Sequence, residues 1–258
     1  MGALAVRRST HHGSVYVSQV SPPTLGARLA AWSVHAYTAT GLVLAMLAID
    51  ALFQQELRWM LIWMMAATFV DATDGTMARR ARVQTITPHF DGRKLDDIVD
   101  FLNFAFVPCL ALYQFDILPP GLRWAAVFPL LASGYGFCQD RAKTEDAFVG
   151  FPSYWNVLLA YFVMIPTPPF VALAIVCILA ALVWVPVHYV YPTKTVFLQR
   201  LTLTSGYAWA TLMIFLSVRL GEPWVPKLAL FSLAYPIYYV AISLVHHRQV
   251  KLRTHASA

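Results

Sequence analysis

Acidic residues gather in one window of an otherwise apolar chain. Of the 13 acidic residues, six fall between residues 71 and 100, in the stretches DATDGTMARR (71–80) and DGRKLDDIVD (91–100). They are Asp71, Asp74, Asp91, Asp96, Asp97 and Asp100. An ionisable group inside an apolar membrane segment costs roughly 2.5 kcal/mol or more, so these carboxylates predict a functional site.

The first half of the window forms one stripe if it is helical. Asp71, Asp74, Gly75, Ala78 and Arg79 stand at i, i+3, i+4, i+7 and i+8, which places them on a single helix face. That face carries two carboxylates, two minimal side chains and one guanidinium. Small residues leave room for a nucleotide, and a guanidinium offers a planar fork for its phosphates.

The second half forms a similar stripe. Gly92, Asp96 and Asp100 stand at i, i+4 and i+8. The pair Thr87-Pro88 predicts a helix that begins near residue 88, because threonine is a good N-cap and proline suits the first turn. Gly92 would then lie inside the helix at a cost of about 1 kcal/mol relative to alanine. This glycine therefore predicts that some group comes close to the backbone.

The two stripes lie at the facing ends of consecutive antiparallel helices, which a short basic turn joins. We therefore expect four carboxylates to converge on one cavity. Such a cluster repels itself and takes up protons unless cations neutralise it, and hard oxygen ligands suit magnesium or manganese. Two ions bridged by shared carboxylates form the clamp used for displacement at phosphorus. The expected metal ligands are Asp71, Asp74, Asp96 and Asp100.

The composition indicates an all-α integral membrane protein. The chain has 59% hydrophobic and 12% charged residues, whereas soluble domains have about 25% charged residues. We predict a single bundle of about eight transmembrane helices. The expected spans are residues 33–53, 57–79, 95–115, 122–139, 150–166, 169–190, 203–219 and 224–245.

The basic residues predict the orientation of the bundle. Placing both termini in the cytoplasm puts 15 of the 19 Lys and Arg residues there, Arg200 and Arg248 among them, as the positive-inside rule expects. The four on the other side are Arg58, Arg123, Arg219 and Lys227. The acidic window then faces the cytoplasm. We expect a cytoplasmic tail at residues 1–27, a transmembrane domain at 28–247 and a second tail at 248–258. Topology and anionic lipid explain the net charge of +6, so no nucleic acid partner is expected.

The whole window, Asp71-x2-Asp74-Gly75-x2-Ala78-Arg79-x12-Gly92-x3-Asp96-x3-Asp100, resembles the signature of the CDP-alcohol phosphotransferase family. These membrane enzymes move a phosphatidyl or related group from a CDP-linked donor onto an alcohol. The twelve residues between the arginine and the second glycine make a longer gap than most members have. This spacing, the eight expected spans and the stretch VHAYTATG (34–41) resemble the bacterial phosphatidylcholine synthase branch.

The resemblance implies a reaction and a role for each motif residue. CDP-diacylglycerol would donate its phosphatidyl group to choline, giving phosphatidylcholine and CMP at the cytoplasmic face of a bacterial inner membrane. The four Asp residues would hold two Mn²⁺ or Mg²⁺ ions, Asp100 would also act as general base, and the enzyme would be a homodimer. The expected contacts to the CDP group are Asp71, Gly75, Ala78, Arg79 and Gly92.

Choline needs aromatic faces, because a quaternary ammonium has no N–H to donate. The segment DRAKTEDAFVGFPSYWN (140–156) resembles a Phe-x-Gly-Leu-Pro-Ser segment of phosphatidylserine synthases, with Tyr and Trp after the Ser. The expected choline-site residues are Tyr154 and Trp155, with Tyr37 or Tyr135 and with Glu145 or Asp146. The YPIYY run (235–239), Tyr189 and Tyr191 are expected to pack or to lie at the membrane interface.

Two alternatives remain open at this stage. The acceptor could be another alcohol, such as serine, inositol phosphate or glycerol phosphate, and the basic loops could serve a phosphorylated one. A cation or proton transporter would also use acids inside the membrane, but it would leave the Gly, Ala and Arg spacing unexplained.

Overall fold

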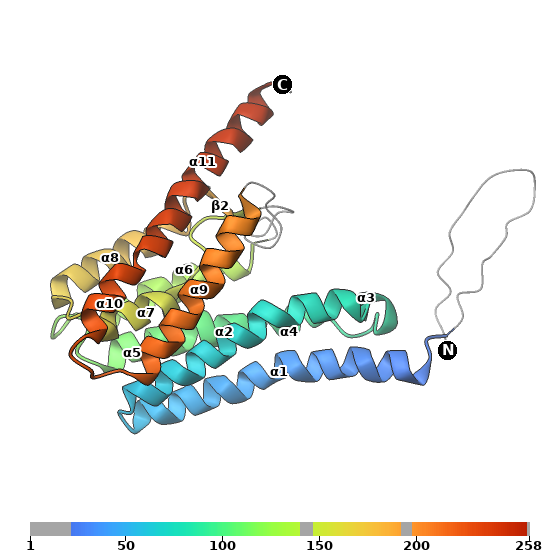
Figure 1. The fold of residues 1–258 in the computed structure, drawn as a ribbon, viewed down its shortest axis with the longest axis horizontal. Helices are drawn as coiled ribbons and strands as arrows, with labels where there is room; N and C mark the ends of the chain where they lie inside the picture. Colours follow the sequence, from blue (N-terminus) through green and yellow to red (C-terminus); the bar gives the residue numbers. More distant parts are fainter. Residues whose placement is uncertain (1–21, 140–146, 192–197, 257–258) are drawn as a thin grey trace, which may run out of the picture.

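The computed structural model describes residues 22–139, 147–191 and 198–256, and it is mostly helical (Figure 1). Most of the predicted apolar segments coincide with a helix or with a run of successive helices. The α-helices are α1 Leu25–Phe53, α2 Leu57–Arg80, α3 Val83–Ile86, α4 Gly92–Asp100, α5 Val107–Gln114, α6 Val127–Phe137, α7 Trp155–Met164, α8 Pro169–Leu182, α9 Gln199–Val218, α10 Val225–Ser232 and α11 Ala234–Ala256. A π-helix, η1 (Phe101–Phe106), joins α4 to α5, and a 3₁₀-helix, η2 (Arg123–Ala126), precedes α6.

Several helices match the thickness of a bilayer. Within the described residues, three are long and apolar enough to cross a membrane, namely Leu25–Phe53, Gln199–Val218 and Val225–Leu252. Large apolar side chains also point outward, and Phe170 and Phe231 expose 69% and 74% of their surface. Such exposure is unfavourable in water but suits a lipid environment. These features indicate a multi-pass membrane protein.

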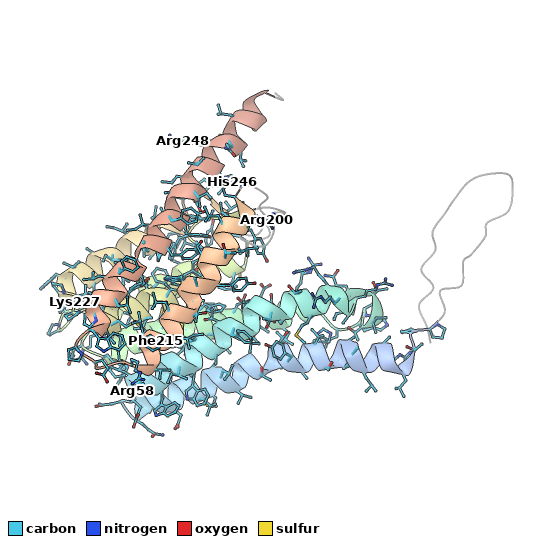
Figure 2. All side chains as sticks on the ribbon, in the orientation of Figure 1. Arg58, Arg200, Phe215, Lys227, His246 and Arg248 are labelled. Atoms are coloured by element: carbon cyan, nitrogen blue, oxygen red, sulfur yellow. The ribbon has the colours of Figure 1, made fainter. Side chains whose placement is uncertain are left out.

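Basic residues separate toward opposite ends of the bundle. Figure 2 shows Arg58 and Lys227 at one end, whereas Arg200 and Arg248 lie at the other. The Arg58 guanidinium donates a hydrogen bond to the Leu220 carbonyl at 2.6 Å, which ties the start of α2 to the end of α9. This separation agrees with the predicted assignment of Arg58 and Lys227 to one side of the membrane and of Arg200 and Arg248 to the other.

The prediction of a purely helical fold was wrong in one place. Ala147–Val149 (β1) and His188–Val190 (β2) form a two-stranded antiparallel sheet, with Phe148 opposite Tyr189. The predicted sixth segment therefore ends as a helix at Leu182. Pro186 cannot continue a helix, and an apolar run does not by itself distinguish a helix from a strand.

The helix that carries the second stripe starts later than expected. It begins at Gly92, and the Asp91 carboxylate caps it by accepting a hydrogen bond from the Lys94 backbone N–H at 3.1 Å. Thr87 was predicted to be the cap, but it follows the end of α3, and its hydroxyl donates to the carbonyl of Val83, the first residue of that helix. Gly92 is consequently the first residue of the helix and does not lie in its interior.

Three helices pack closely around the acidic window. Helices α1 and α2 lie side by side along most of their length, and α4 also packs on α1 (Figure 1). Gly41 of α1 lies against Val99 of α4. A Cβ atom built there would lie 2.3 Å from the Cγ1 atom of Val99, so only glycine fits.

A substitution at this contact tests the packing. We expect Gly41→Ala to lower the thermal unfolding midpoint in detergent, because overpacking costs about 1–3 kcal/mol and the β-branched Val99 has little rotamer freedom in a helix. Gly26→Ala on the same helix is the control, because a Cβ there meets nothing within 4 Å. Adding Val99→Ala should rescue Gly41→Ala. Equal midpoints for the two alanine variants would contradict the packing.

Candidate metal and nucleotide site

Three of the predicted carboxylates come together between α2 and α4. One oxygen each from Asp71, Asp96 and Asp100 lies within 4.8 Å of the other two. Asp71 and Asp96 are partly exposed, whereas Asp100 is 8% exposed. We call these three residues the acidic cluster. Their convergence confirms that the two stripes face each other.

The spacing of the acidic cluster suits a divalent cation. Mg²⁺ binds oxygen at about 2.1 Å, so opposite ligands of one ion lie about 4.2 Å apart, and shared carboxylates span two ions about 3.5–4 Å apart. Neighbouring oxygens of one octahedral ion lie about 3.0 Å apart, so side-chain movements of about 1–2 Å would bring the three oxygens to ligand distances. The acidic cluster can therefore hold a metal ion.

Asp74 is held by helix α1. It is 6% exposed, and its carboxylate accepts a hydrogen bond of 2.8 Å from the Thr38 hydroxyl. One residue away on each helix, the hydroxyls of Tyr37 and Thr73 hydrogen-bond at 2.8 Å. The Thr73 hydroxyl donates to carbonyl groups of its own helix, so the Tyr37 O–H is the donor to Thr73. These two contacts set the rotation of α2 relative to α1.

Asn103 supports the site from the π-helix that follows Asp100. Its amide N–H₂ group donates to the carbonyls of Gly41 and Val99, each at 3.0 Å. The side chain is 2% exposed, and its oxygen has no hydrogen-bond partner within the described residues. π-Helical turns often occur at functional sites, and an unsatisfied buried oxygen is costly. Asn103 was not among the predicted site residues. An Asn in an apolar run, one turn after a motif Asp, is the signal in the sequence that could have indicated it.

The predicted close approach at Gly92 is confirmed, and the approaching group is His35. A Cβ atom at Gly92 would lie 2.7 Å from the Cε1 atom of His35, whose ring is buried. His35 Nε2 lies 3.0 Å from the Thr87 hydroxyl oxygen. Because the Thr87 proton goes to the Val83 carbonyl, the His35 Nε2–H is the donor. His35 therefore ties α1 to the start of α4.

The remaining motif residues flank the acidic cluster on α2. Arg79 is exposed, and its guanidinium donates to the Thr76 hydroxyl at 2.9 Å. The same guanidinium passes over Gly75, where a Cβ would lie 3.4 Å from Nη1. Ala78 packs in a small apolar cluster with Ala31 and Val34 of α1. Within the described part of the chain, Arg79 forms no buried salt bridge that would stop it from meeting a phosphate.

The expected choline-site residues are separated in the structure. Trp155 is fully buried, and its indole N–H donates to the Ser133 hydroxyl at 2.7 Å, so it packs away from any ligand. Tyr135 is 49% exposed and lies beside Trp184. Glu145 and Asp146 lie outside the described residues.

Tyr154 is the expected choline-site residue that lies close to the acidic cluster. It immediately precedes α7 and is partly buried. The Tyr154 hydroxyl forms a hydrogen bond with the Tyr239 hydroxyl, and the Asp71 carboxylate lies nearby. Tyr154 therefore places a phenol ring beside a carboxylate of the acidic cluster.

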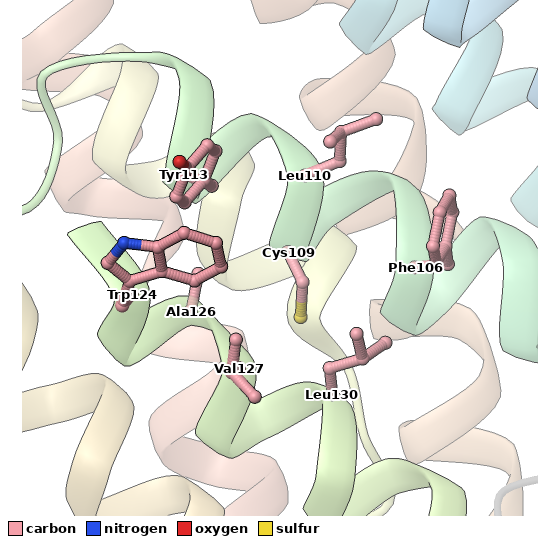
Figure 3. A pocket seen from close by; sticks show the side chains of 8 residues that line it. All are labelled: Phe106, Cys109, Leu110, Tyr113, Trp124, Ala126, Val127 and Leu130. Atoms are coloured by element: carbon pink, nitrogen blue, oxygen red, sulfur yellow. The ribbon is translucent and has the colours of Figure 1, made fainter.

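A separate apolar cavity of about 250 Å³ opens between α5 and α6 (Figure 3). The side chains that line it are Phe106, Cys109, Leu110, Tyr113, Trp124, Ala126, Val127 and Leu130. None of them carries a formal charge, and most are apolar.

Comparisons with known proteins point to one kind of enzyme. The chain is 38% identical over 181 residues to a phosphatidylcholine synthase from Pseudomonas aeruginosa, and the aligned region covers 69% of this chain and 76% of that protein. It is 38% identical over 193 residues to one from Legionella pneumophila, with 71% and 74% covered. It is 30% identical over 213 residues to one from Brucella melitensis, with 81% and 77% covered. No family model matches the chain.

Removal of one carboxylate tests the metal site. We expect Asp71→Asn to weaken Mn²⁺ binding to the purified protein by at least about tenfold, because the amide oxygen is neutral. Electron paramagnetic resonance of the bound ion measures this without any substrate. Asp91→Asn is the matched control, because Asp91 is exposed and asparagine also caps a helix. Equal Mn²⁺ affinities in the two variants would argue against the site.

Proposed function

The chain belongs to the phosphatidylcholine synthase family, and we propose that it transfers the phosphatidyl group of CDP-diacylglycerol to choline, releasing CMP. One observation carries the proposal: carboxylates from two facing helices meet within 4.8 Å, beside small residues and an exposed arginine. Displacement at phosphorus needs this combination, because it requires cations for the phosphates and a base for the attacking hydroxyl.

Two Mn²⁺ or Mg²⁺ ions would bind at Asp71, Asp74, Asp96 and Asp100. When bound, the ions neutralise the charge on the leaving phosphate. Asp74 would join the acidic cluster as a ligand through the carboxylate oxygen that Thr38 does not contact, since a carboxylate accepts several bonds at once. The Thr38 hydrogen bond would then orient Asp74, as second-shell partners do in other metal sites.

Asp100 would act as the general base. The choline oxygen attacks the phosphorus that carries diacylglycerol, and the bond between that phosphorus and the CMP oxygen breaks. Asp100 takes the proton from the choline hydroxyl as the new bond forms. Asp100 is the most buried member of the acidic cluster. This burial would limit the access of water, which would otherwise compete with choline as the nucleophile.

The CDP group would lie over the second half of α2 and the start of α4. Gly75 leaves space on the surface of α2, whereas Ala78 and Gly92 would let α1 and its His35 side chain pack close beside the nucleotide. Arg79 would pair with the phosphates through its fork of N–H groups. Asp71 would contact the CDP group as well as the metal. Arg79 needs only to exchange its Thr76 contact for a phosphate oxygen.

In the membrane, we propose one domain at residues 28–247 with eight spans and with both tails in the cytoplasm of a bacterium. The separation of Arg58 and Lys227 from Arg200 and Arg248 supports this arrangement. The active site would then open at the cytoplasmic face of the inner membrane. A homodimer is expected from the family.

An acceptor-competition assay tests the proposed reaction. Purified protein with Mn²⁺ and CDP-diacylglycerol is offered choline, serine, glycerol phosphate and inositol phosphate together. We expect phosphatidylcholine and CMP as the products, and no turnover when the metal is chelated. If another phospholipid were the product, the acceptor would be a different alcohol and the reaction class would stay the same. Ion transport without CMP release would instead indicate a transporter.

The role of Asp100 has its own test. We expect Asp100→Asn to lower kcat by about 100-fold or more, the typical contribution of general base catalysis, with CDP-diacylglycerol binding changed much less. Single-turnover rates and nucleotide binding are measured separately, and Asp91→Asn again serves as the control. Equal loss of binding and turnover would make Asp100 a metal ligand without a role as base.

A further inference from the structure

Tyrosines from three distant segments meet beside the acidic cluster. Tyr154 precedes α7, Tyr189 and Tyr191 lie in and just after β2, and Tyr235 and Tyr239 lie on α11. We call these five residues the tyrosine cluster. The ring centroid of Tyr239 lies 6.2 Å from that of Tyr154 and 6.4 Å from that of Tyr189. Tyr191 and Tyr235 complete the surroundings of the Tyr154 phenol.

Hydrogen bonds and backbone geometry hold this arrangement. The Tyr239 hydroxyl donates to the Val190 carbonyl at 2.9 Å and also hydrogen-bonds with the Tyr154 hydroxyl. Ser153, directly before Tyr154, has a left-handed backbone with φ of 56°, which is unfavourable for a residue other than glycine. Such strain tends to occur at functional sites, where the surrounding structure maintains it.

The tyrosine cluster lies next to the acidic cluster because α7 packs against α2. The Asn156 side chain donates to the Thr68 hydroxyl at 3.0 Å, one helical turn from Asp71. Tyr154 comes two residues before Asn156, on the side toward Asp71. The Asp71 carboxylate also lies near the Tyr154 phenol. One ligand can therefore reach both clusters.

Phenol rings suit a particular kind of ligand. Tyr189 and Tyr239 are buried and form a wall, whereas Tyr154, Tyr191 and Tyr235 are partly exposed. The Tyr191 ring packs on Phe148 and the Tyr235 ring stacks on Trp209, so each offers its remaining surface to a ligand. Aromatic faces attract cations that cannot donate hydrogen bonds, such as quaternary ammonium groups. In choline, two carbons separate the nitrogen from the hydroxyl, so the ammonium must lie directly beside the reacting phosphorus. The tyrosine cluster meets both requirements.

We propose that the tyrosine cluster binds the quaternary ammonium group of choline and makes the enzyme selective for this acceptor. This inference rests on the proposed function and extends it from Tyr154 to residues of β2 and α11. Other aromatic groups are engaged elsewhere: the Tyr37 hydroxyl donates to Thr73, and Trp155 is buried against Ser133. Phe90 and Trp32 stack around His35 at the start of α4.

Ring deletion and ring retention distinguish this role from a structural one. We expect Tyr235→Leu to raise the choline KM about tenfold, or about 1.4 kcal/mol, with the KM for CDP-diacylglycerol unchanged. Tyr235→Phe keeps the ring and loses only a weak 3.4 Å hydrogen bond to the Thr202 carbonyl, so its choline KM should stay within about twofold of the parent value. Tyr154→Leu and Tyr154→Phe form a second pair. Tyr207→Leu is the control, since Tyr207 is 63% exposed on α9.

Inhibition and direct binding complete the test. Tetramethylammonium should compete with choline, whereas dimethylbutanol, in which carbon replaces the charged nitrogen, should not. Choline KM values unchanged in both Leu variants would overturn the proposal, and so would Phe variants as impaired as the Leu variants.

Calorimetric measurement of choline binding without CDP-diacylglycerol tests the ammonium site separately from the proposed reaction. Tyrosine-dependent binding without phosphatidylcholine synthesis would refute the proposed reaction while supporting the ammonium site.

Discussion

The free-energy cost of keeping carboxylates within an apolar helical bundle is the constraint on which the structure depends. Asp74 and Asp100 expose only 6% and 8% of their surface. An ionised carboxylate at such a position is stable only with hydrogen bonds or cations close to it. The Thr38 hydroxyl supplies one such bond to Asp74, and the convergence of Asp71, Asp96 and Asp100 forms a place where a cation offsets the remaining charge.

Helix α1 supplies much of this support without carrying a motif carboxylate. Within residues 34–41, His35 packs under Gly92, Thr38 binds Asp74, and Gly41 receives Val99 and Asn103. These contacts recur on one side of the helix, so a rotation or shift of α1 would move α2 and α4 together. A substitution in this stretch would therefore disturb the metal site without touching a substrate. The same contacts explain why small residues and a hydroxyl are needed there.

Local patterns were sufficient to predict the two helices of the acidic window and the convergence of three of the four expected carboxylates, Asp71, Asp96 and Asp100. The 3.6-residue period places Asp96 and Asp100 on the same helix face wherever the helix begins. An error of four residues in the predicted start therefore did not change the predicted acidic face. That error arose because Thr87 and Asp91 are both good caps, and only the tertiary bond between His35 and Thr87 distinguishes them. The β1–β2 pairing joins segments about 40 residues apart, which no local pattern reveals.

The tyrosines of α11 show a different limit of sequence patterns. Aromatic residues near the end of an apolar helix are typical of the membrane interface, and the YPIYY run has that character. Only the position of α11 against β2 brings Tyr235 and Tyr239 to Tyr154. The fold thus separates two tasks: α1, α2 and α4 position the carboxylates, whereas α7, β2 and α11 shape the space beside them. Under the proposed function, acceptor selectivity would therefore depend on other elements than the chemistry at phosphorus does.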